Sequence, residues 1–211
     1  MVPITNQRTL AEIATIRTGY TFRGKVTELT DGGNAHIAQI KDARRAWEAT
    51  NTAVLCAEQL PRIQWEGKDK VFVGAGSVIL PARGSKGGYF RASCIARKHD
   101  DALPIAVSGQ FLVITPNNAV LPEFLCWSLN QPAMQYWLAE GAGSQGSSIV
   151  MLTAKMAKEL TLDIPSLETQ HKILHLNQLW EQEQQLTHAL LKNRETMLQG
   201  MFQQQLKEKN A

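Results

Sequence analysis

Cysteine is scarce in this chain of 211 residues, and its three copies (Cys56, Cys94 and Cys126) stand far apart without a CxxC pair. This spacing argues against a disulfide framework and against a zinc site, and it favours a reducing compartment. No apolar run approaches the ~20 residues that a bilayer span needs. The start, MVPITNQRTL, lacks the basic and apolar regions of a signal peptide. The sequence therefore predicts a cytoplasmic protein with no membrane segment.

Motifs that would indicate catalysis are missing or incomplete. GAGSQG (141–146) matches the dinucleotide fingerprint, but it follows a predicted helix and enters SSIVML, whereas the fingerprint must leave a strand and open a helix. His171 and His175 have the spacing of a metal pair, yet KIL separates them and no third ligand is evident. Neither an Asn/Asp-Pro-Pro-aromatic methyltransferase tetrapeptide nor a PD-(D/E)xK nuclease constellation can be assembled. We expect no enzyme activity, no metal and no cofactor in this chain itself.

Positive charge is unevenly distributed along the chain. Residues 1–100 carry 15 Lys/Arg and 9 Asp/Glu, whereas residues 101–211 carry 7 and 10. The segment 81–99 holds five basic residues and no acidic one. Such a concentration suggests a polyanionic partner, although an ordinary solvated surface explains the composition equally well.

The pattern of apolar residues predicts an α+β domain in which short helices alternate with strands. We expect the stretch 43–70 to be loop with short elements. The predicted elements are a helix over 8–17, a half-buried strand in HIAQIKD (36–42), strands within 71–83 and 107–116, a helix from Pro122 that Pro132 breaks or kinks, and a short helix capped by Thr153.

A long polar helix is predicted from Ser166, its N-cap, to about residue 209. At ~1.5 Å per residue this helix is about 64 Å long, too long for a domain of ~150 residues to cover its apolar stripe. The sequence therefore predicts a partner helix and two regions, a domain over 1–155 and a helical region over 156–211. The stripe has heptad-like spacing and consists of Leu176, Leu179, Leu186, Leu190, Met197 and Met201.

The best candidate for a binding site is the glycine-rich segment PARGSKGGYF (81–90). Arg83, Ser85 and Lys86 would present donors on a turn whose glycines allow close approach to a sugar–phosphate chain. We expect HIAQIKD to serve as framework. The alternative for the segment 81–90 is an exposed turn between two strands. Weaker basic candidates, chosen for charge and for position in or beside predicted loops, are Arg91, Arg44, Arg45, Arg62 and Lys68.

These segments, in this order, resemble the specificity (S) subunits of type I restriction–modification systems. The matching elements are LAEIATIRTGYTFR, HIAQIKD, VILPARGSKGGY, VSGQFLVITP, LPEFLCWSLNQPAMQYWL and, most distinctive, the block over 149–173. The resemblance covers about 9–205 and is weakest over 43–70. Each motif is loose alone, but their fixed order is specific.

The resemblance implies a target recognition domain over 1–155 that reads double-stranded DNA, followed by a spacer helix that pairs as an antiparallel coiled coil. Family members normally carry two such domains in one chain, whereas this chain has one, so we expect a homodimer that reads two inverted half-sites. The expected partners are methyltransferase subunits, which bind S-adenosylmethionine, and possibly a restriction subunit. Alternatives are a scaffold that docks methyltransferase subunits without reading DNA, an enzyme that uses GAGSQG, and a truncated piece of a full-length subunit.

Overall fold

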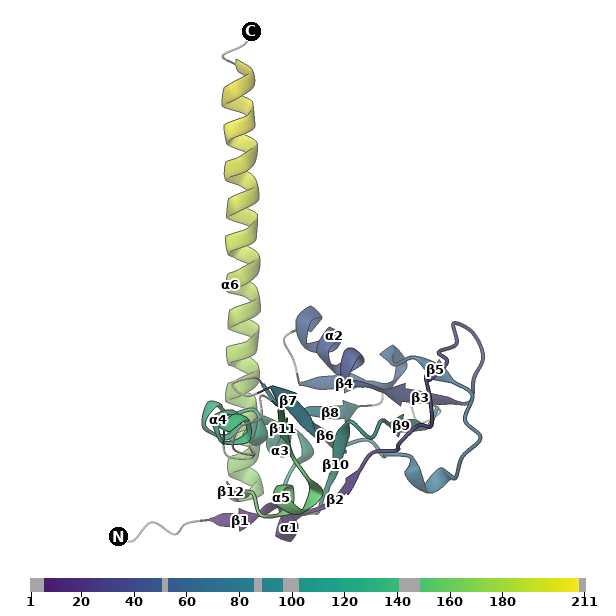
Figure 1. Cartoon of the computed structure of the whole chain (residues 1–211). Coiled ribbons are helices and arrows are strands. Elements are labelled where there is room, and N and C mark those ends of the chain that lie inside the picture. The colour runs from purple at the N-terminus through teal and green to yellow at the C-terminus, as the bar shows by residue number, and fades with distance from the viewer. Residues whose placement is uncertain (1–5, 51–52, 86–88, 97–102, 141–148, 209–211) are drawn as a thin grey trace, which may run out of the picture. The chain divides into compact units, whose positions relative to one another are not determined.

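A five-stranded sheet forms the centre of the folded part of the chain (Figure 1). The computed structural model describes residues 6–50, 53–85, 89–96, 103–140 and 149–208. Neighbouring strands of the sheet run antiparallel, except for the last pair, which is parallel. In spatial order the strands are β2 (Ala14–Thr18), β10 (Phe111–Pro116), β6 (Val78–Pro81), β8 (Ser93–Ala96) and β4 (Val54–Cys56).

A three-stranded sheet of β5 (Arg62–Ile63), β3 (Ala35–Ala38) and β9 (Ile105–Val107) is the second element of the core. One apolar cluster joins residues of both sheets, and a second cluster contains residues of β3, β5 and β9. All four residues of β3 are therefore buried. The prediction of a half-buried strand over 36–42 is wrong in both extent and burial, because the strand is covered on both sides and ends at Ala38.

Helix α2 (Ile40–Thr50) follows β3 directly. The Gln39 backbone N–H donates to Asp42 Oδ2 at 3.0 Å, which satisfies one donor at the start of the helix. Residues 43–50, which belong to this helix, occupy the start of the stretch predicted to be loop, and that prediction is wrong there. The rest of the stretch does consist of short elements, which are β4, η1 (Ala57–Gln59), β5 and η2 (Asp69–Val71).

The N-terminal segment is shorter in helix than predicted. β1 (Gln7–Thr9) leads into α1 (Leu10–Ile13), and β2 begins at the next residue, so the predicted helix over 8–17 is wrong before Leu10 and beyond Ile13. Leu10 and Ile13 are buried, as the predicted amphipathic face requires. β-branched residues dominate the second half of the segment and favour the strand.

Pro132 separates two helices, as predicted: α3 (Pro122–Leu129) and α4 (Pro132–Glu140). α3 packs against β6, β8 and β10 of the five-stranded sheet. Two amide side chains then bind the segment before β8. Gln135 pairs with both the backbone N–H and the carbonyl of Phe90, and Asn130 pairs in the same way with Ala92.

The C-terminal part of the chain folds as the capping residues predict. Thr153 Oγ1 accepts from Met156 N at 3.2 Å and starts α5 (Ala154–Lys158). Two small antiparallel sheets complete the fold: β11 (Ile149–Met151) with β7 (Arg83–Ser85), and β12 (Thr161–Asp163) with β1. Ser166 then caps α6 (Leu167–Glu208), a helix of 42 residues. The α+β class and the long helix are confirmed.

Gln170, in the first turns of α6, is fully buried and fastens the start of the helix. Its amide donates to the carbonyls of Ala119 and Pro165 and accepts from Leu121 N. By their internal contacts the residues form two units, 1–170 and 171–211. The start of α6 therefore belongs to the first unit, and the remainder of the helix is a unit by itself.

The two larger sheets are linked where the end of β2 crosses the turn between β9 and β10. Gly19 N donates to Phe111 O, Tyr20 N donates to Val107 O and Gly109 N donates to Tyr20 O. A Cβ atom on Gly19 would lie 2.2 Å from the carbonyl oxygen of Ser108. The crossing therefore has no space for a side chain at residue 19.

We expect Gly19→Ala to lower the free energy of unfolding by about 1–3 kcal/mol, because the new methyl group meets backbone atoms that are held on both sides. Gly74→Ala is the matched control. A Cβ at Gly74 meets nothing within 4 Å, so this change should be neutral or slightly stabilising. Urea unfolding of both variants measures the difference, and equal stability would contradict the proposed crowding.

Candidate nucleic-acid interface

Within the glycine-rich segment predicted to contact a polyanion, residues Arg83–Ser85 form strand β7. Arg83 and Ser85 are its two ends, and both are exposed. A Cβ on Gly84, between them, would lie 2.6 Å from the Phe90 ring, so this strand lies tightly over a buried aromatic side chain. Lys86 lies outside the described residues. Arg83 is thus presented from a strand with a fixed backbone.

Arg91 is held by aromatic side chains. Its guanidinium carbon lies 4.7 Å from the centre of the Trp47 ring and 5.1 Å from that of Tyr89, which is cation–π geometry. Trp47 belongs to α2, the helix that also carries Arg44 and Arg45, both exposed. The structure therefore brings three of the predicted basic residues to one region, where Arg91 has a packing role.

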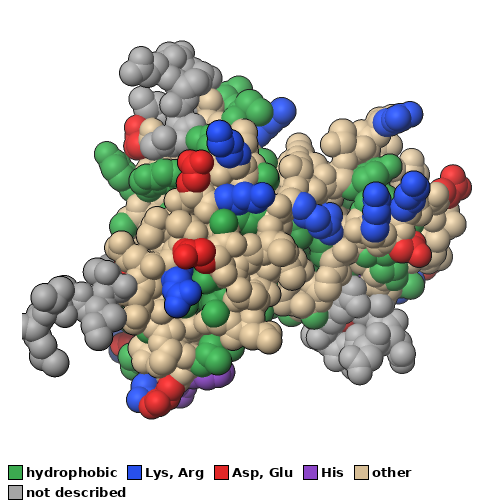
Figure 2. Space-filling model, turned by 90° about the horizontal axis from the view of Figure 1, so that it is seen from below, with side chains coloured by type: hydrophobic (Ala, Val, Ile, Leu, Met, Phe, Trp, Pro, Cys, Tyr) green, Lys and Arg blue, Asp and Glu red, His purple; other side chains and the backbone are tan. Residues whose placement is uncertain are grey.

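The remaining predicted cations lie elsewhere on the first unit. Arg62 is exposed on β5, and its carbonyl accepts from Leu29 N at 2.9 Å. Lys68 is exposed immediately before η2. On the face shown in Figure 2, basic side chains are scattered and acidic side chains stand among them. Arg62 and Lys68 thus lie on other elements than Arg44 and Arg45.

A cleft of about 940 Å³ opens at the ends of four strands. Segment 20–28 follows β2, Gln39 and Lys41 follow β3, Arg83 follows β6, and segment 108–110 follows β9. β3 and β9 are parallel, and β2 and β6 are both antiparallel to β10, so the strands of each pair point the same way. The fold thereby gathers residues that are far apart in the sequence at one open cleft.

The cleft is rich in groups that bind anions and hydrogen-bonding partners. Lys25, Lys41 and Arg83 give it three positive side chains, against the single carboxylate of Glu28 among its described lining residues. Amide, hydroxyl and backbone groups make up much of the remaining wall. Of the predicted site residues that the structure describes, Arg83 lines this cleft and the others do not.

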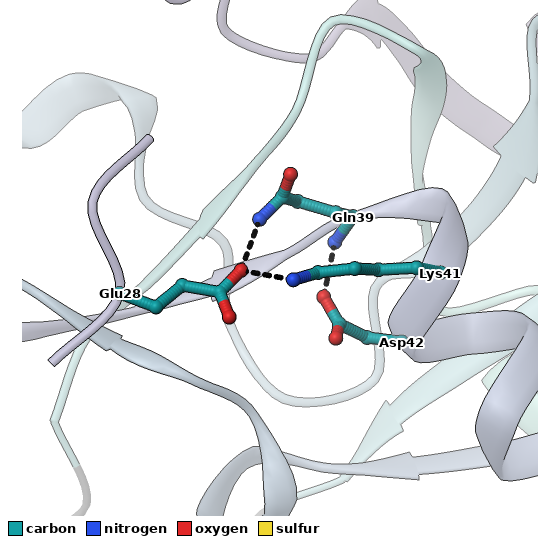
Figure 3. A network of polar contacts seen from close by, with 4 residues as sticks. All are labelled: Glu28, Gln39, Lys41 and Asp42. Carbon is teal, nitrogen blue, oxygen red and sulfur yellow. Dashed lines mark hydrogen bonds and ion pairs between the residues drawn. The ribbon is translucent and has the colours of Figure 1, made fainter. Parts of the chain in front are cut away.

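A polar network inside the cleft joins Glu28 to the start of α2 (Figure 3). Glu28 Oε1 accepts from Gln39 Nε2 at 3.0 Å and from Lys41 Nζ. Asp42 accepts from the Gln39 backbone on the other side. Burial raises the pKa of the Asp42 carboxyl, an effect that the Gln39 N–H opposes because it favours the charged form. Gln39 therefore lies between two carboxylates and is oriented by both.

An aromatic cluster supports the wall formed by segment 20–28. The Tyr20 ring centre lies 4.9 Å from that of Phe22 and 5.0 Å from that of Trp65, both in edge-to-face arrangements. Trp65 is itself fixed by Asn34, whose side chain pairs with the Trp65 N–H and carbonyl. The wall formed by segment 20–28 is therefore anchored on the three-stranded sheet.

The sequence did not point to Lys25, Gln39, Lys41 or Glu28 as site residues. Gln39 and Lys41 were assigned to a framework strand, whereas they stand just after a buried strand ends. Polar residues directly following a short apolar run were the available signal. The two-residue alternation of HIAQIKD hid this signal, because it matches a strand pattern up to the point where α2 begins.

The sequence also raised the question of a metal site, a nucleotide-binding loop and a membrane span. Within the described residues, no group of three or more His, Cys, Asp or Glu side chains is placed to hold a metal ion. GAGSQG lies outside the described residues. In the part of the chain that the structure describes, no helix is long and apolar enough to cross a membrane.

The cysteines are free, and two of them are buried. Burial raises the pKa of the Cys94 thiol to about 12, with a smaller contribution from the Glu123 carboxylate. Burial also raises the pKa of Cys126, with further contributions from Cys94 and Glu123. Both thiols are therefore held in the neutral form, which is a poor nucleophile.

Comparison with known proteins identifies the family. Residues 5–192 match the family described as the type I restriction modification DNA specificity domain. This chain belongs to that family. It is also similar to the type I restriction enzyme HindI specificity subunit of Haemophilus influenzae, with 33% identity over 97 residues that cover 46% of this chain and 21% of that protein.

Solved structures show the same fold at low sequence identity. The HsdS subunit from Thermoanaerobacter tengcongensis superposes with a TM-score of 0.55 and 16% identity, over 90% of this chain and 41% of that one. A chain from a study of complex assembly and conformational transition of the type I R-M system gives a TM-score of 0.58 and 17% identity, over 90% and 42%. This chain thus spans about two fifths of those structures and about a fifth of the curated relative.

The raised pKa of Cys94 leads to a prediction about alkaline stability. In the unfolded chain the thiol ionises near its ordinary pKa of ~8.5, whereas in the folded chain it stays neutral until about pH 12. Its contribution to folding is therefore complete below pH ~8.5 and is lost as the pH rises from there toward 12. We expect a loss on the order of 2 kcal/mol from this thiol by about pH 10.5. Urea unfolding at pH 8 and pH 10.5 should show a smaller loss for Cys94→Ala than for the control Cys56→Ala, and equal losses would contradict the assignment.

Proposed function

We propose that this chain is the DNA-reading specificity subunit of a type I restriction–modification complex. It binds double-stranded DNA in the cleft at the strand ends, pairs with a second copy through α6, and brings methyltransferase subunits to the bound site. The observation that carries the proposal is the cleft itself. It combines three cations with oriented amide and carboxylate groups in a chain of a DNA specificity family.

The composition of the cleft supports duplex DNA as the ligand. Phosphate contacts from Lys and Arg give affinity and position the protein, while amide, carboxylate and bidentate basic groups distinguish base edges. Lys25 and Arg83 supply the first kind of group, and Gln39 and Glu28 supply the second. An open cleft built on strand ends also holds these groups in fixed relation, which sequence discrimination requires.

The exposed apolar stripe of α6 supports a homodimer. Leu176, Leu179, Leu186, Leu190, Met197 and Met201 are all exposed in the single chain. Leaving such side chains in water costs about 1.5–3 kcal/mol each relative to burial. A two-fold axis would let two copies cover the same stripe on each other, because a C2 interface is self-complementary. With antiparallel helices, the two clefts would read two inverted half-sites.

A second apolar stripe on α6 supports docking of a further partner. Each of its first four members lies one residue after a member of the first stripe, about 100° further around the helix. A pair of helices can bury one seam well, so a broader apolar face favours an additional helix from another subunit. We propose that the methyltransferase subunits supply it. The stripe consists of Trp180, Leu191, Leu198, Phe202 and Leu206, all exposed in the single chain.

Catalysis in this proposal belongs to the partners. S-adenosylmethionine would bind the methyltransferase subunit, and a restriction subunit would cut where one is present. The specificity chain contributes the choice of site and the geometry of assembly in the reducing cytoplasm. If the chain docked methyltransferase subunits but did not bind DNA, the scaffold alternative would hold instead.

The first test concerns Arg83. We expect Arg83→Ala to weaken duplex binding and, where Arg83 contacts phosphate, to lower the slope of log affinity against log salt by about 0.9. Lys155→Ala, which removes an exposed cation from α5 outside the cleft, is the charge-matched control. Fluorescence anisotropy over a salt series gives both quantities. Identical behaviour of the two variants would show that Arg83 has no role in DNA binding.

The second test concerns α6. Leu186→Glu combined with Leu190→Glu places two carboxylates within the proposed seam and should give a monomer by sedimentation, with unit 1–170 still folded. Gln178→Glu combined with Gln185→Glu adds the same charge about a third of a turn away around the helix axis and should leave the dimer intact. A wild-type chain that sediments as a monomer at micromolar concentration would rule out the homodimer.

A further inference from the structure

The network of Glu28, Gln39 and Lys41 presents a donor and an acceptor side by side inside the cleft (Figure 3). Lys41 Nζ and Gln39 Nε2 both donate to the same carboxylate oxygen, Glu28 Oε1. The Lys41 and Glu28 side chains remain 50% and 34% exposed, so both are accessible to a ligand in the cleft. The cation and the carboxylate thus reach the ligand as an adjacent pair.

Each member of the network is carried by a backbone that is fixed independently. Val26 packs against the apolar cluster on β3, and Leu29 N donates to Arg62 O, so Glu28 lies between two anchored residues. Gln39 and Lys41 flank the start of α2, where Asp42 holds the Gln39 backbone N–H. The fold therefore sets the backbone positions of the three residues, and their mutual hydrogen bonds orient the side chains.

The ion pair has little value for stability. Exposed pairs of this kind contribute little to stability, because solvent screens them and ordering two long side chains costs entropy. The two groups can therefore exchange partners at low cost when a ligand enters. Glu28 also makes Lys41 a poor phosphate contact, since a phosphate that approached Lys41 would meet the carboxylate beside it.

A base edge satisfies both groups where a phosphate cannot. In the major groove a G·C pair presents two adjacent acceptors, guanine N7 and O6, next to the cytosine N4 donor, whereas an A·T pair places its donor between two acceptors. Lys pairs with the guanine acceptors, and Glu accepts from cytosine N4. The order of charges in the Lys41–Glu28 pair matches the G·C edge.

We propose that Lys41 and Glu28 together read one G·C base pair in each half-site, with Gln39 as the residue that positions the Glu28 carboxylate. This assignment rests on the proposed function, because it presupposes that duplex DNA enters the cleft. Lys41 donates to guanine N7 and O6, and Glu28 accepts from cytosine N4. Lys25 and Arg83, the other two cations among the described lining residues of the cleft, are left for the sugar–phosphate chain.

The experiment selects bound sequences from a library of duplexes with a randomised core, using the full chain as wild type, Glu28→Gln, Lys41→Ala and Gln39→Ala. We expect the wild-type motif to contain a G·C pair whose preference Glu28→Gln and Lys41→Ala both relax, with the other positions unchanged. Affinity for the wild-type motif should fall about tenfold to a hundredfold for each of these two variants. Gln39→Ala should relax the same position less. Lys155→Ala should leave the motif unchanged.

The sign of the Glu28→Gln effect separates this proposal from an ordinary surface ion pair. Removing a carboxylate near DNA strengthens binding to every duplex equally if Glu28 only repels phosphates, whereas loss of a cytosine contact weakens binding to the preferred motif alone. A uniform gain, or a uniform loss for Lys41→Ala with a salt slope lower by about 0.9, overturns the proposal. So does a relaxed position that is A·T in the wild-type motif.

The outcomes also distinguish this proposal from the proposed function. If the wild-type chain selects a motif and all three cleft variants select the same motif, the base-reading assignment is refuted and DNA binding still stands. A wild-type chain that selects no motif from the library refutes sequence-specific DNA reading itself, and the base-reading assignment with it. Thermal unfolding of each variant shows that the fold is retained, as the exposure of Lys41 and Glu28 leads us to expect.

Discussion

The crossing of Gly19 over Ser108 is the constraint on which the cleft depends. β2 belongs to the five-stranded sheet and β9 to the three-stranded sheet, and backbone hydrogen bonds between their ends fix one sheet against the other. These bonds require the two backbones to approach so closely that a Cβ at residue 19 would overlap the Ser108 carbonyl. The segments that follow the crossing, 20–28 and 108–110, are two walls of the cleft. These two walls are thus positioned by the same contact.

Amide side chains provide hydrogen-bond partners for backbone groups that the short strands of this fold leave unpaired. Many of its strands are only three or four residues long, so much of the buried backbone lies beyond regular pairing and still needs partners. Asn34, Asn130 and Gln135 each pair with both the N–H and the carbonyl of one residue, as a neighbouring strand would. Gln170 serves the turn before α3 and fastens the start of α6. Irregular segments thereby become rigid enough to carry a binding surface.

The chain separates two kinds of recognition by their physics. The apolar stripes of α6 offer burial, which is strong but non-directional and suits association along a helix. The cleft offers donors and acceptors in fixed directions, which contribute less net energy and discriminate more between ligands. The second kind requires preorganisation, and the anchored backbones around Glu28 and Gln39 provide it. The proposed function needs both, since it combines assembly with partner subunits and selection among DNA sequences.

Features that depend on neighbours along the chain could be predicted from the sequence. Pro132 breaks a helix, Thr153 and Ser166 cap the next two, and the long apolar stripe requires one continuous helix of the observed extent. The order of these local signals was also sufficient to indicate the family. The α2 helix was missed because its apolar positions are few, so tertiary packing of Ala43 and Ala46 decides its conformation.

The set of residues that line the cleft could not be predicted from the sequence. The order of the strands in the sheets brings these residues together, and that order is not visible in the sequence. Lys25, Lys41 and Arg83 are distant in sequence and meet at one cleft because β2, β3 and β6 end beside it. HIAQIKD was predicted to be a half-buried strand. Because β3 is buried on both sides, the segment is instead a core strand that is followed by site residues. Local propensity and capping thus determined most of the helices, and the order of the sequence motifs indicated the family. Sheet pairing, a long-range property that no short window of sequence contains, decided which side chains share the site.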